Sequence, residues 1–199
     1  MTYQYEQFDK ALRLLDGRLA IGAAPNYNLV VCGGTALMAT GLIIRTTRDV
    51  DIVALADDEG GLIDPAPLPD PLVKAAKEVA DDLGLPNDWL NNGPSSGEGG
   101  IYRLGLPHGF ADRLSWKRFG EKLTVAFIDR IDQIHFKLYA AVDRFGSYHA
   151  TDLQELEPTD DELLAAAAWT RTHDPSEGYL ESLKMFFRKF GYEHLADRV

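Results

Sequence analysis

The sequence has little cysteine and no long apolar run, and each shortage excludes a class of protein. Cys32 is the only cysteine among 199 residues, so the chain can form neither an internal disulfide nor a cysteine-based zinc site. No apolar run approaches the ~20 residues of a membrane-spanning helix, and the first residues lack the basic and apolar regions of a signal peptide. We therefore expect a cytoplasmic protein in which Cys32 packs as a small apolar side chain.

Positive charge is also scarce. The chain has 20 basic and 31 acidic residues and a net charge of −11, which opposes broad, nonspecific binding to nucleic acids. One local patch could still dock RNA, because aromatic side chains interleave there with cations; its members are Lys117, Arg118, Lys122, Trp116 and Phe119. The stretch 115–124 also fits a β-hairpin that turns at residues 119–122 and carries solvated charges.

Hydrophobic periodicity predicts a mixed α/β (α+β) domain that ends in helices. We expect one main unit, with a core over residues 1–130 and a helical C-terminal region over 131–199, either packed on the core or continuous with it. The expected helices span 5–19, 35–40, 71–83, 132–144, 160–170 and 176–190, the expected strands span 28–32, 49–53 and 123–128, and the expected loops span 54–71 and 86–100. Trp89 is expected to anchor the second of these loops.

A glycine turn follows the first predicted strand. Gly33 and Gly34 permit a tight turn between the apolar run 28–32 and the segment that begins at Thr35. Backbone amides at the start of a helix attract phosphate groups. The turn therefore predicts a phosphate-binding element that consists of Gly33, Gly34 and Thr35.

Two alternate acids open the next strand. Side chains alternate between the faces of a strand, so Asp49 and Asp51 should project to one side while Val50 and Ile52 face the core. Mg²⁺ commonly takes one or two protein carboxylates and completes its shell with water and substrate phosphates. The sequence thus predicts a magnesium and triphosphate site built on Asp49 and Asp51.

These motifs resemble the nucleotidyltransferase superfamily, and more closely the AbiEii-like toxin nucleotidyltransferases. The resemblance is carried by Gly-Gly-Thr-Ala-Leu at 33–37 and by Arg-x-Thr-x-Asp-Val-Asp at 45–51. It extends through the segments 84–91 and 109–114 to the lysine-bearing helix 131–144, and covers roughly residues 28–156. It implies a nucleotidyltransferase-type mixed sheet flanked by helices, a nucleoside triphosphate as substrate, and an antitoxin as partner in some relatives.

Lys137 and Asp152 are further candidates for the site. A lysine at the edge of the helix 131–144, whose expected buried stripe is Ile131, Ile134, Leu138 and Ala141, can meet triphosphate oxygens as a point charge. The resemblance assigns site roles to this lysine and to an acid in the next segment, a position that Asp152 fits. The alternatives are a surface lysine with its charge in solvent and a helix N-cap at Asp152.

Arg45 and Thr47 precede the acid pair. The arginine can bind phosphate or pair with Asp49 or Asp51, and the threonine can orient a carboxylate. The superfamily's third acid has no clear counterpart, since the strand 123–128 offers no carboxylate before Asp129. The base for the acceptor is then Asp152, Asp51 or no protein group.

Together these residues predict a Mg²⁺-dependent transferase that moves a nucleoside monophosphate from a triphosphate to a hydroxyl group. The resemblance favours RNA, such as a tRNA end, or a protein side chain as acceptor, and a toxin–antitoxin pair as setting. Two alternatives stay open: a small-molecule nucleotidyltransferase of the aminoglycoside type, and a noncatalytic binding module that keeps the fold.

Overall fold

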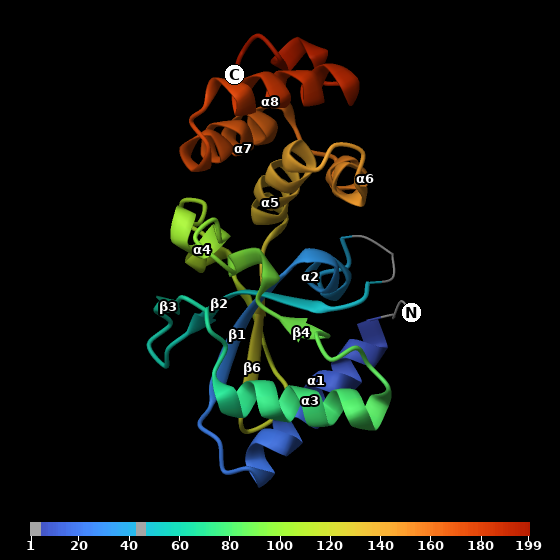
Figure 1. Cartoon of the computed structure of the whole chain (residues 1–199), viewed down its shortest axis with the longest axis vertical. Coiled ribbons are helices and arrows are strands. Elements are labelled where there is room, and N and C mark those ends of the chain that lie inside the picture. The colour runs from blue at the N-terminus through green and yellow to red at the C-terminus, as the bar shows by residue number, and fades with distance from the viewer. Residues whose placement is uncertain (1–4, 43–46) are drawn as a thin grey trace. The chain divides into compact units, whose positions relative to one another are not determined.

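The chain folds into two compact units, Met1–Asp129 and Arg130–Val199. The computed structural model describes residues 5–42 and 47–199. The first unit contains a six-stranded mixed sheet with helices, and the second unit is helical (Figure 1). A mixed α/β architecture is thereby confirmed.

The sheet is built around β1. Its strands have the order β3-β2-β1-β6-β5, and β4 pairs separately with β2. Strand β1 runs antiparallel to β2 and parallel to β6. Their bounds are β1 Tyr27–Cys32, β2 Val50–Ala56, β3 Leu62–Ile63, β4 Leu90–Asn91, β5 Ser115–Arg118 and β6 Leu123–Phe127.

The described residues of the first unit form four helices. Helix α1 lies beside α3 in Figure 1, and it buries an apolar stripe that contains Phe8, Leu12 and Leu15. The spacing of these residues at three and four positions is typical of an amphipathic helix. The helices are α1 Tyr5–Ile21, α2 Gly33–Ala39, α3 Asp70–Leu83 and α4 Ile101–Leu104, with single 3₁₀ turns at Gly93–Ser95 and Ala111–Arg113.

The helices of the second unit are α5 Arg130–Asp143, α6 Tyr148–Glu155, α7 Asp160–His173 and α8 Glu177–Lys189, followed by a 3₁₀ turn at Glu193–Leu195. Thr159 and Glu162 form a reciprocal capping box at the start of α7, which satisfies two backbone amides there. Arg130 donates hydrogen bonds to both carboxylate oxygens of Glu162 and to the carbonyls of Leu156 and Glu157. One guanidinium therefore connects the start of α5 with the connection between α6 and α7.

The predicted loop over 54–71 is partly wrong. Strand β2 continues to Ala56, and β3 pairs with it after a short turn. The Asp57 side chain makes this turn, because its Oδ1 accepts hydrogen bonds from the amides of Glu59 and Gly61 at 2.9 and 2.7 Å. An aspartate that satisfies the backbone in this way favours a tight turn over an open loop.

The predicted loop over 86–100 also contains regular structure. β4 runs parallel to the start of β2, with Leu90 opposite Val50 and Asn91 opposite Asp51. The expected anchor is confirmed: Trp89 is fully buried, and its indole Nε1 donates to the carbonyl of Ala76 in α3 at 2.9 Å. The tertiary position of Trp89 thus brings this segment onto the edge of the sheet.

The burial of Ile131 and Cys32 was also predicted from the sequence. Ile131, expected in the buried stripe of the fifth helix, is 37% exposed, whereas Ile134, Leu138 and Ala141 are buried. Cys32 is buried at the end of β1, as predicted. Within the described parts of the chain, no helix has the length and apolarity needed to cross a membrane.

Candidate active site

The glycine turn and the acidic strand are in direct contact. Gly33 follows β1 with a φ of 69°, a left-handed conformation that glycine adopts without steric cost. A Cβ atom added at Gly33 would lie 2.6 Å from Oδ2 of Asp51. Cys32 and Asp51 are opposite each other in the antiparallel β1–β2 pairing. The absence of a side chain at Gly33 is therefore what lets the Asp51 carboxylate lie against the turn.

Asp49 and Asp51 alternate with core residues as predicted. Val50 and Ile52 are fully buried, whereas both aspartates are partly exposed. Residues two apart in extended backbone project to the same side, so the two carboxylates face the side on which Asp51 meets the glycine turn. An irregularity in the pairing with β1, between Val30 and Val31, comes only after this segment.

Thr35 connects the turn to the acids through its side chain. It is fully buried, and its Oγ1 donates a hydrogen bond of 2.6 Å to the backbone carbonyl of Asp49. The hydroxyl thereby holds the entry of β2 against the start of α2. The nucleotide-binding role predicted for Thr35 stays a prediction, and it would fall to the backbone amide of this residue.

Thr47 lies two residues before Asp49 in the sequence. It is buried, and its Oγ1 lies 3.4 Å from Oδ1 of Asp49, a long hydrogen bond. This contact agrees with the prediction that Thr47 orients a carboxylate. The predicted phosphate contact of Arg45 falls outside the described residues.

The donor set of Asp49 and Asp51 fits Mg²⁺. Hard carboxylate oxygens from one or two side chains, completed by water and substrate phosphates, are typical of this ion. Among the described residues, no group of three or more histidine, cysteine, aspartate and glutamate side chains gathers closely enough to hold a metal by itself. A magnesium ion at this position would be bound by Asp49, Asp51 and oxygen atoms of the nucleotide.

One further carboxylate lies at this end of the sheet. β1 and β6 are parallel with Val31 opposite Phe127, and the amide of Ile128 donates to the carbonyl of Val31 at 3.2 Å. Asp129 therefore follows β6 at the level at which Gly33 follows β1, and it is partly exposed. The sequence shows this acid at the end of a predicted strand, but only the parallel pairing puts that end beside the glycine turn.

Lys137 and Asp152 form a buried ion pair within the second unit. Their Nζ and Oδ2 atoms are 2.7 Å apart, and the side chains are 5% and 4% exposed. The interpretation of Lys137 as a surface lysine is therefore wrong. Asp152 is not an N-cap either, because it lies inside α6, which Ser147 caps. The ring of Tyr148 lies 5.6 Å from the Lys137 ammonium group, close enough for a cation–π contact.

A pair buried to this degree is a weak source of stability, since the desolvation of two charges offsets much of their attraction. The predicted site residues divide between the units: Asp49 and Asp51 belong to the first, and Lys137 and Asp152 to the second.

The turn of the basic hairpin lies away from the glycine turn. β5 and β6 pair as predicted, and the amide of Tyr27, at the start of β1, donates to the carbonyl of Lys122. The turn of the hairpin thus lies at the opposite end of β1 from Gly33, about 20 Å away for a strand of six residues. Lys117, which the strand pairing puts level with Leu29 in the middle of β1, forms an ion pair with Asp9, with 2.7 Å between Nζ and Oδ1.

The charged groups at this hairpin form contacts within the fold. Burial alone raises the pKa of Asp9, but hydrogen bonds from Lys117 and Arg13 outweigh it, so that the pKa is lowered. The Lys117 ammonium group also lies 5.0 Å from the centroid of the buried Phe119 ring. The hairpin prediction is confirmed, and its cations serve in part to join β5 to α1.

Comparisons of the chain with protein-family models, with curated proteins and with solved structures find no match.

Proposed function

We propose that this chain is a Mg²⁺-dependent nucleotidyltransferase of the AbiEii-like type, which moves a nucleoside monophosphate from a triphosphate to an acceptor hydroxyl. The contact between the Asp51 carboxylate and the Gly33 turn carries the proposal. It joins, within one unit, the two motifs on which the resemblance rests. A phosphate chain on the turn would lie directly beside the two acids.

The residues of the first unit divide the work of binding. Backbone amides of Gly33, Gly34 and Thr35 would hold phosphate oxygens, and Thr35 would keep Asp49 in place through its hydroxyl. Asp49 and Asp51 would hold Mg²⁺, which neutralises phosphate charge and activates the α-phosphorus toward attack. The bond from the acceptor oxygen to the α-phosphorus forms as the bond to pyrophosphate breaks, and catalysis comes from positioning and charge neutralisation.

The site roles of Lys137 and Asp152, which both belong to the second unit, come from the resemblance alone. Within that unit, Asp152 accepts a hydrogen bond from Lys137 and holds its ammonium group in place. The proton of the acceptor hydroxyl would pass to solvent or to a carboxylate of the first unit, for which Asp51 and Asp129 are the candidates.

The acceptor is an RNA end, such as that of a tRNA, or a hydroxyl of a protein side chain, and the setting is a toxin–antitoxin pair. Both come from the resemblance alone. The hairpin cations offer no support for RNA at this site, because Arg118 and Lys122 lie toward the other end of β1 and Lys117 is paired with Asp9.

The test is transfer of label from each α-labelled nucleoside triphosphate to bulk RNA, to protein and to aminoglycosides. The wild-type chain is compared with Asp49→Asn and Asp51→Asn, which preserve side-chain size but remove a charge. Asp58→Asn is the matched control, since Asp58 is an exposed acid beyond β2. We expect Mg²⁺-dependent label on one acceptor class, lost in the two site variants and retained in the control.

The outcomes separate the alternatives. Label on aminoglycosides alone would assign the chain to small-molecule transfer. No Mg²⁺-dependent nucleotide binding by folded protein, measured by calorimetry, would favour the noncatalytic binding module and reject the proposal.

A further inference from the structure

One peptide group between the two acids of the candidate site is held on both of its sides. The carbonyl of the Asp49–Val50 peptide belongs to Asp49 and accepts the 2.6 Å hydrogen bond from Oγ1 of Thr35. Its amide belongs to Val50 and donates a hydrogen bond of 2.6 Å to the carbonyl of Trp89. Because the peptide is trans, its carbonyl and its amide point in opposite directions. Thr35 and Trp89 therefore hold this group from opposite sides of β2.

The strand pairing continues this arrangement at the second acid. Asp51 lies opposite Cys32 in β1 and opposite Asn91 in β4. The start of β2 is therefore an inner strand, although β4 consists of only two residues. The backbone that carries both carboxylates is thus fixed by the glycine turn on one side and by the segment of Trp89 on the other.

Trp89 is held at every polar group of its backbone and side chain. It is fully buried, and its indole Nε1 donates a hydrogen bond of 2.9 Å to the carbonyl of Ala76 in α3. Its amide donates to the carbonyl of Pro86 at 3.1 Å, and its carbonyl accepts from Val50. The three contacts lead to α3, to the turn before β4 and to the acidic strand. The side chain of Trp89 thereby determines where its carbonyl meets β2.

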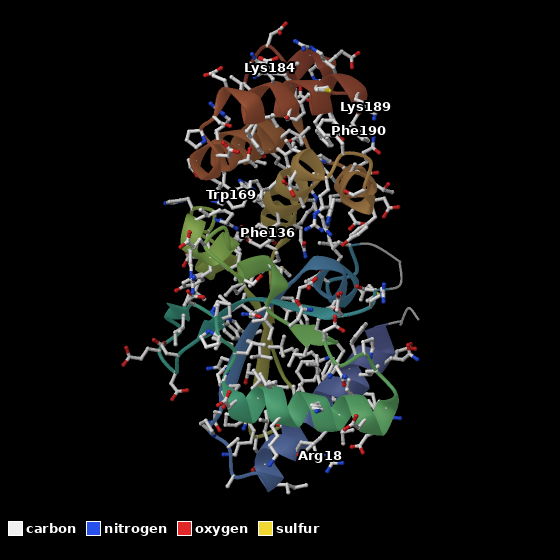
Figure 2. The ribbon with its side chains drawn as sticks, viewed as in Figure 1. Arg18, Phe136, Trp169, Lys184, Lys189 and Phe190 are labelled. Atoms are coloured by element: carbon white, nitrogen blue, oxygen red, sulfur yellow. The ribbon has the colours of Figure 1, made fainter. Side chains whose placement is uncertain are left out.

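Helix α3, which carries this anchor, is itself held in the fold. Its apolar face is buried, and Arg18 of α1 donates a hydrogen bond to the carboxylate of Asp82 near the end of α3 (Figure 2). A chain of contacts thus runs from α3 through Trp89 to the Asp49–Val50 peptide.

We propose that Trp89 is a positioning residue of the metal site, which holds the Asp49–Val50 peptide and thereby sets the separation of the Asp49 and Asp51 carboxylates. The inference rests on the proposed function, which assigns Mg²⁺ to these two acids. Mg²⁺ requires nearly ideal octahedral geometry with short bonds to oxygen, so its affinity depends on how the backbone presents the carboxylates. Removal of a group that orients a metal ligand commonly lowers metal affinity by about 10–100-fold.

The first variant is Trp89→Phe, which keeps an aromatic ring in the core but removes the indole donor. Its matched control is Tyr102→Phe, which removes the donor of a 2.7 Å hydrogen bond to the carbonyl of Leu62 in the same unit. Calorimetry measures Mg²⁺ binding to the full chain in the presence of each α,β-methylene nucleoside triphosphate, which cannot undergo transfer. We expect Trp89→Phe to weaken Mg²⁺ binding about tenfold and Tyr102→Phe to bind Mg²⁺ as the wild type does. A tryptophan that served packing alone would change the urea midpoint and leave this affinity unchanged.

The second variant tests the hydrogen bond itself. Replacement of Val50 by α-hydroxyisovalerate turns the Asp49–Val50 peptide into an ester, which keeps every side chain but has no N–H to donate to Trp89. The control ester replaces Gly61 by glycolate and removes the amide that donates to Asp57 beyond the end of β2. We expect the ester at Val50 to weaken Mg²⁺ binding about tenfold and the ester at Gly61 to leave it unchanged.

The outcomes separate this inference from the proposed function. Unchanged Mg²⁺ affinity in Trp89→Phe or in the ester at Val50 would overturn the inference and leave the proposed function standing. Equal losses in the two controls would also overturn it, because the effect would then be one of general stability. Folded wild-type protein that binds no Mg²⁺ with any of the triphosphate analogues would reject the proposed function, and the positioning role with it. Circular dichroism establishes that each variant is folded, and if Trp89→Phe does not fold, the ester at Val50 decides.

Discussion

Replacement of Gly33 by alanine tests the contact on which the site is built. A Cβ at this position would lie 2.6 Å from Oδ2 of Asp51, whereas ordinary contacts begin at 3.4 Å. The carboxylate must then move by about 0.8 Å, the difference of these two distances. A displacement of about 1 Å in a reacting group can lower a rate by roughly 100-fold. We expect Gly33→Ala to lower nucleotidyl transfer by about that factor and to weaken Mg²⁺ binding.

The same chain provides a matched control. Gly41 has a φ of 70°, within a degree of Gly33, but a Cβ added there meets no atom within 4 Å. Both substitutions place alanine in a left-handed conformation, at a cost of about 1–2 kcal/mol each. Urea unfolding should therefore show similar losses of stability for the two variants. Only Gly33→Ala should impair Mg²⁺ binding, measured by calorimetry, and transfer of α-label.

The reasoning fails if Gly33→Ala binds Mg²⁺ and transfers nucleotide as Gly41→Ala does. It also fails if Gly33→Ala loses several kcal/mol more stability than Gly41→Ala, because the carboxylate would then be unable to move aside and the defect would be one of folding.

Three further predictions follow from single interactions. Thr35→Val should lower the free energy of unfolding by about 1–2 kcal/mol, because it removes the 2.6 Å hydrogen bond to the partly buried carbonyl of Asp49. Thr35→Ser should retain most of this stability, and equal urea midpoints for both variants would contradict the prediction. Lys137→Met should lower the free energy of unfolding by about 3–5 kcal/mol, because it leaves the buried Asp152 without its partner. The double variant Lys137→Met with Asp152→Leu should restore stability without restoring nucleotide transfer. A stable single variant or an active double variant would contradict the roles assigned to this pair. The hydrogen bond from Arg130 lowers the pKa of Glu162, so this pair should stabilise the fold above the unfolded-state pKa of about 4.3 and lose that contribution as the pH falls through the lower folded-state pKa. Urea unfolding of the wild type and of Glu162→Gln between pH 3 and 7 should therefore show a difference in stability that shrinks as the pH falls. A difference that stays constant with pH would contradict the assignment of this stability to the pair.

Much of the local structure was predictable because it depends on neighbours in sequence. The apolar stripe of α1, the cap at Ser176 and the turn of the β5–β6 hairpin each follow from periodicity or from a single turn residue. The alternation of Asp49 and Asp51 with buried residues followed in the same way. The predictions were wrong where the secondary structure of a segment depends on a distant part of the chain. An example is β4, which is a strand because it pairs with β2.

The Lys137–Asp152 pair also depends on tertiary packing that the local sequence does not reveal. Periodicity put Lys137 at the edge of an apolar stripe, and nothing local indicated that a carboxylate 15 residues away would meet it. Since α6 carries Asp152 in its interior, helix packing rather than capping sets that residue's position. The sequence therefore indicated Lys137 and Asp152 as candidates, and helix packing determined that their side chains pair with each other.

By itself, the sequence determined the elements and the chemistry they carry: a glycine turn that tolerates positive φ, two acids on one face of a strand, and a helical C-terminal region. These follow from backbone sterics and side-chain periodicity, which act over a few residues. Only the tertiary structure decided that the Asp51 carboxylate lies against Gly33, that Thr35 holds Asp49, and that Lys117 of β5 pairs with Asp9 of α1. Such contacts join segments far apart in the chain, and strand pairing and helix packing select them together.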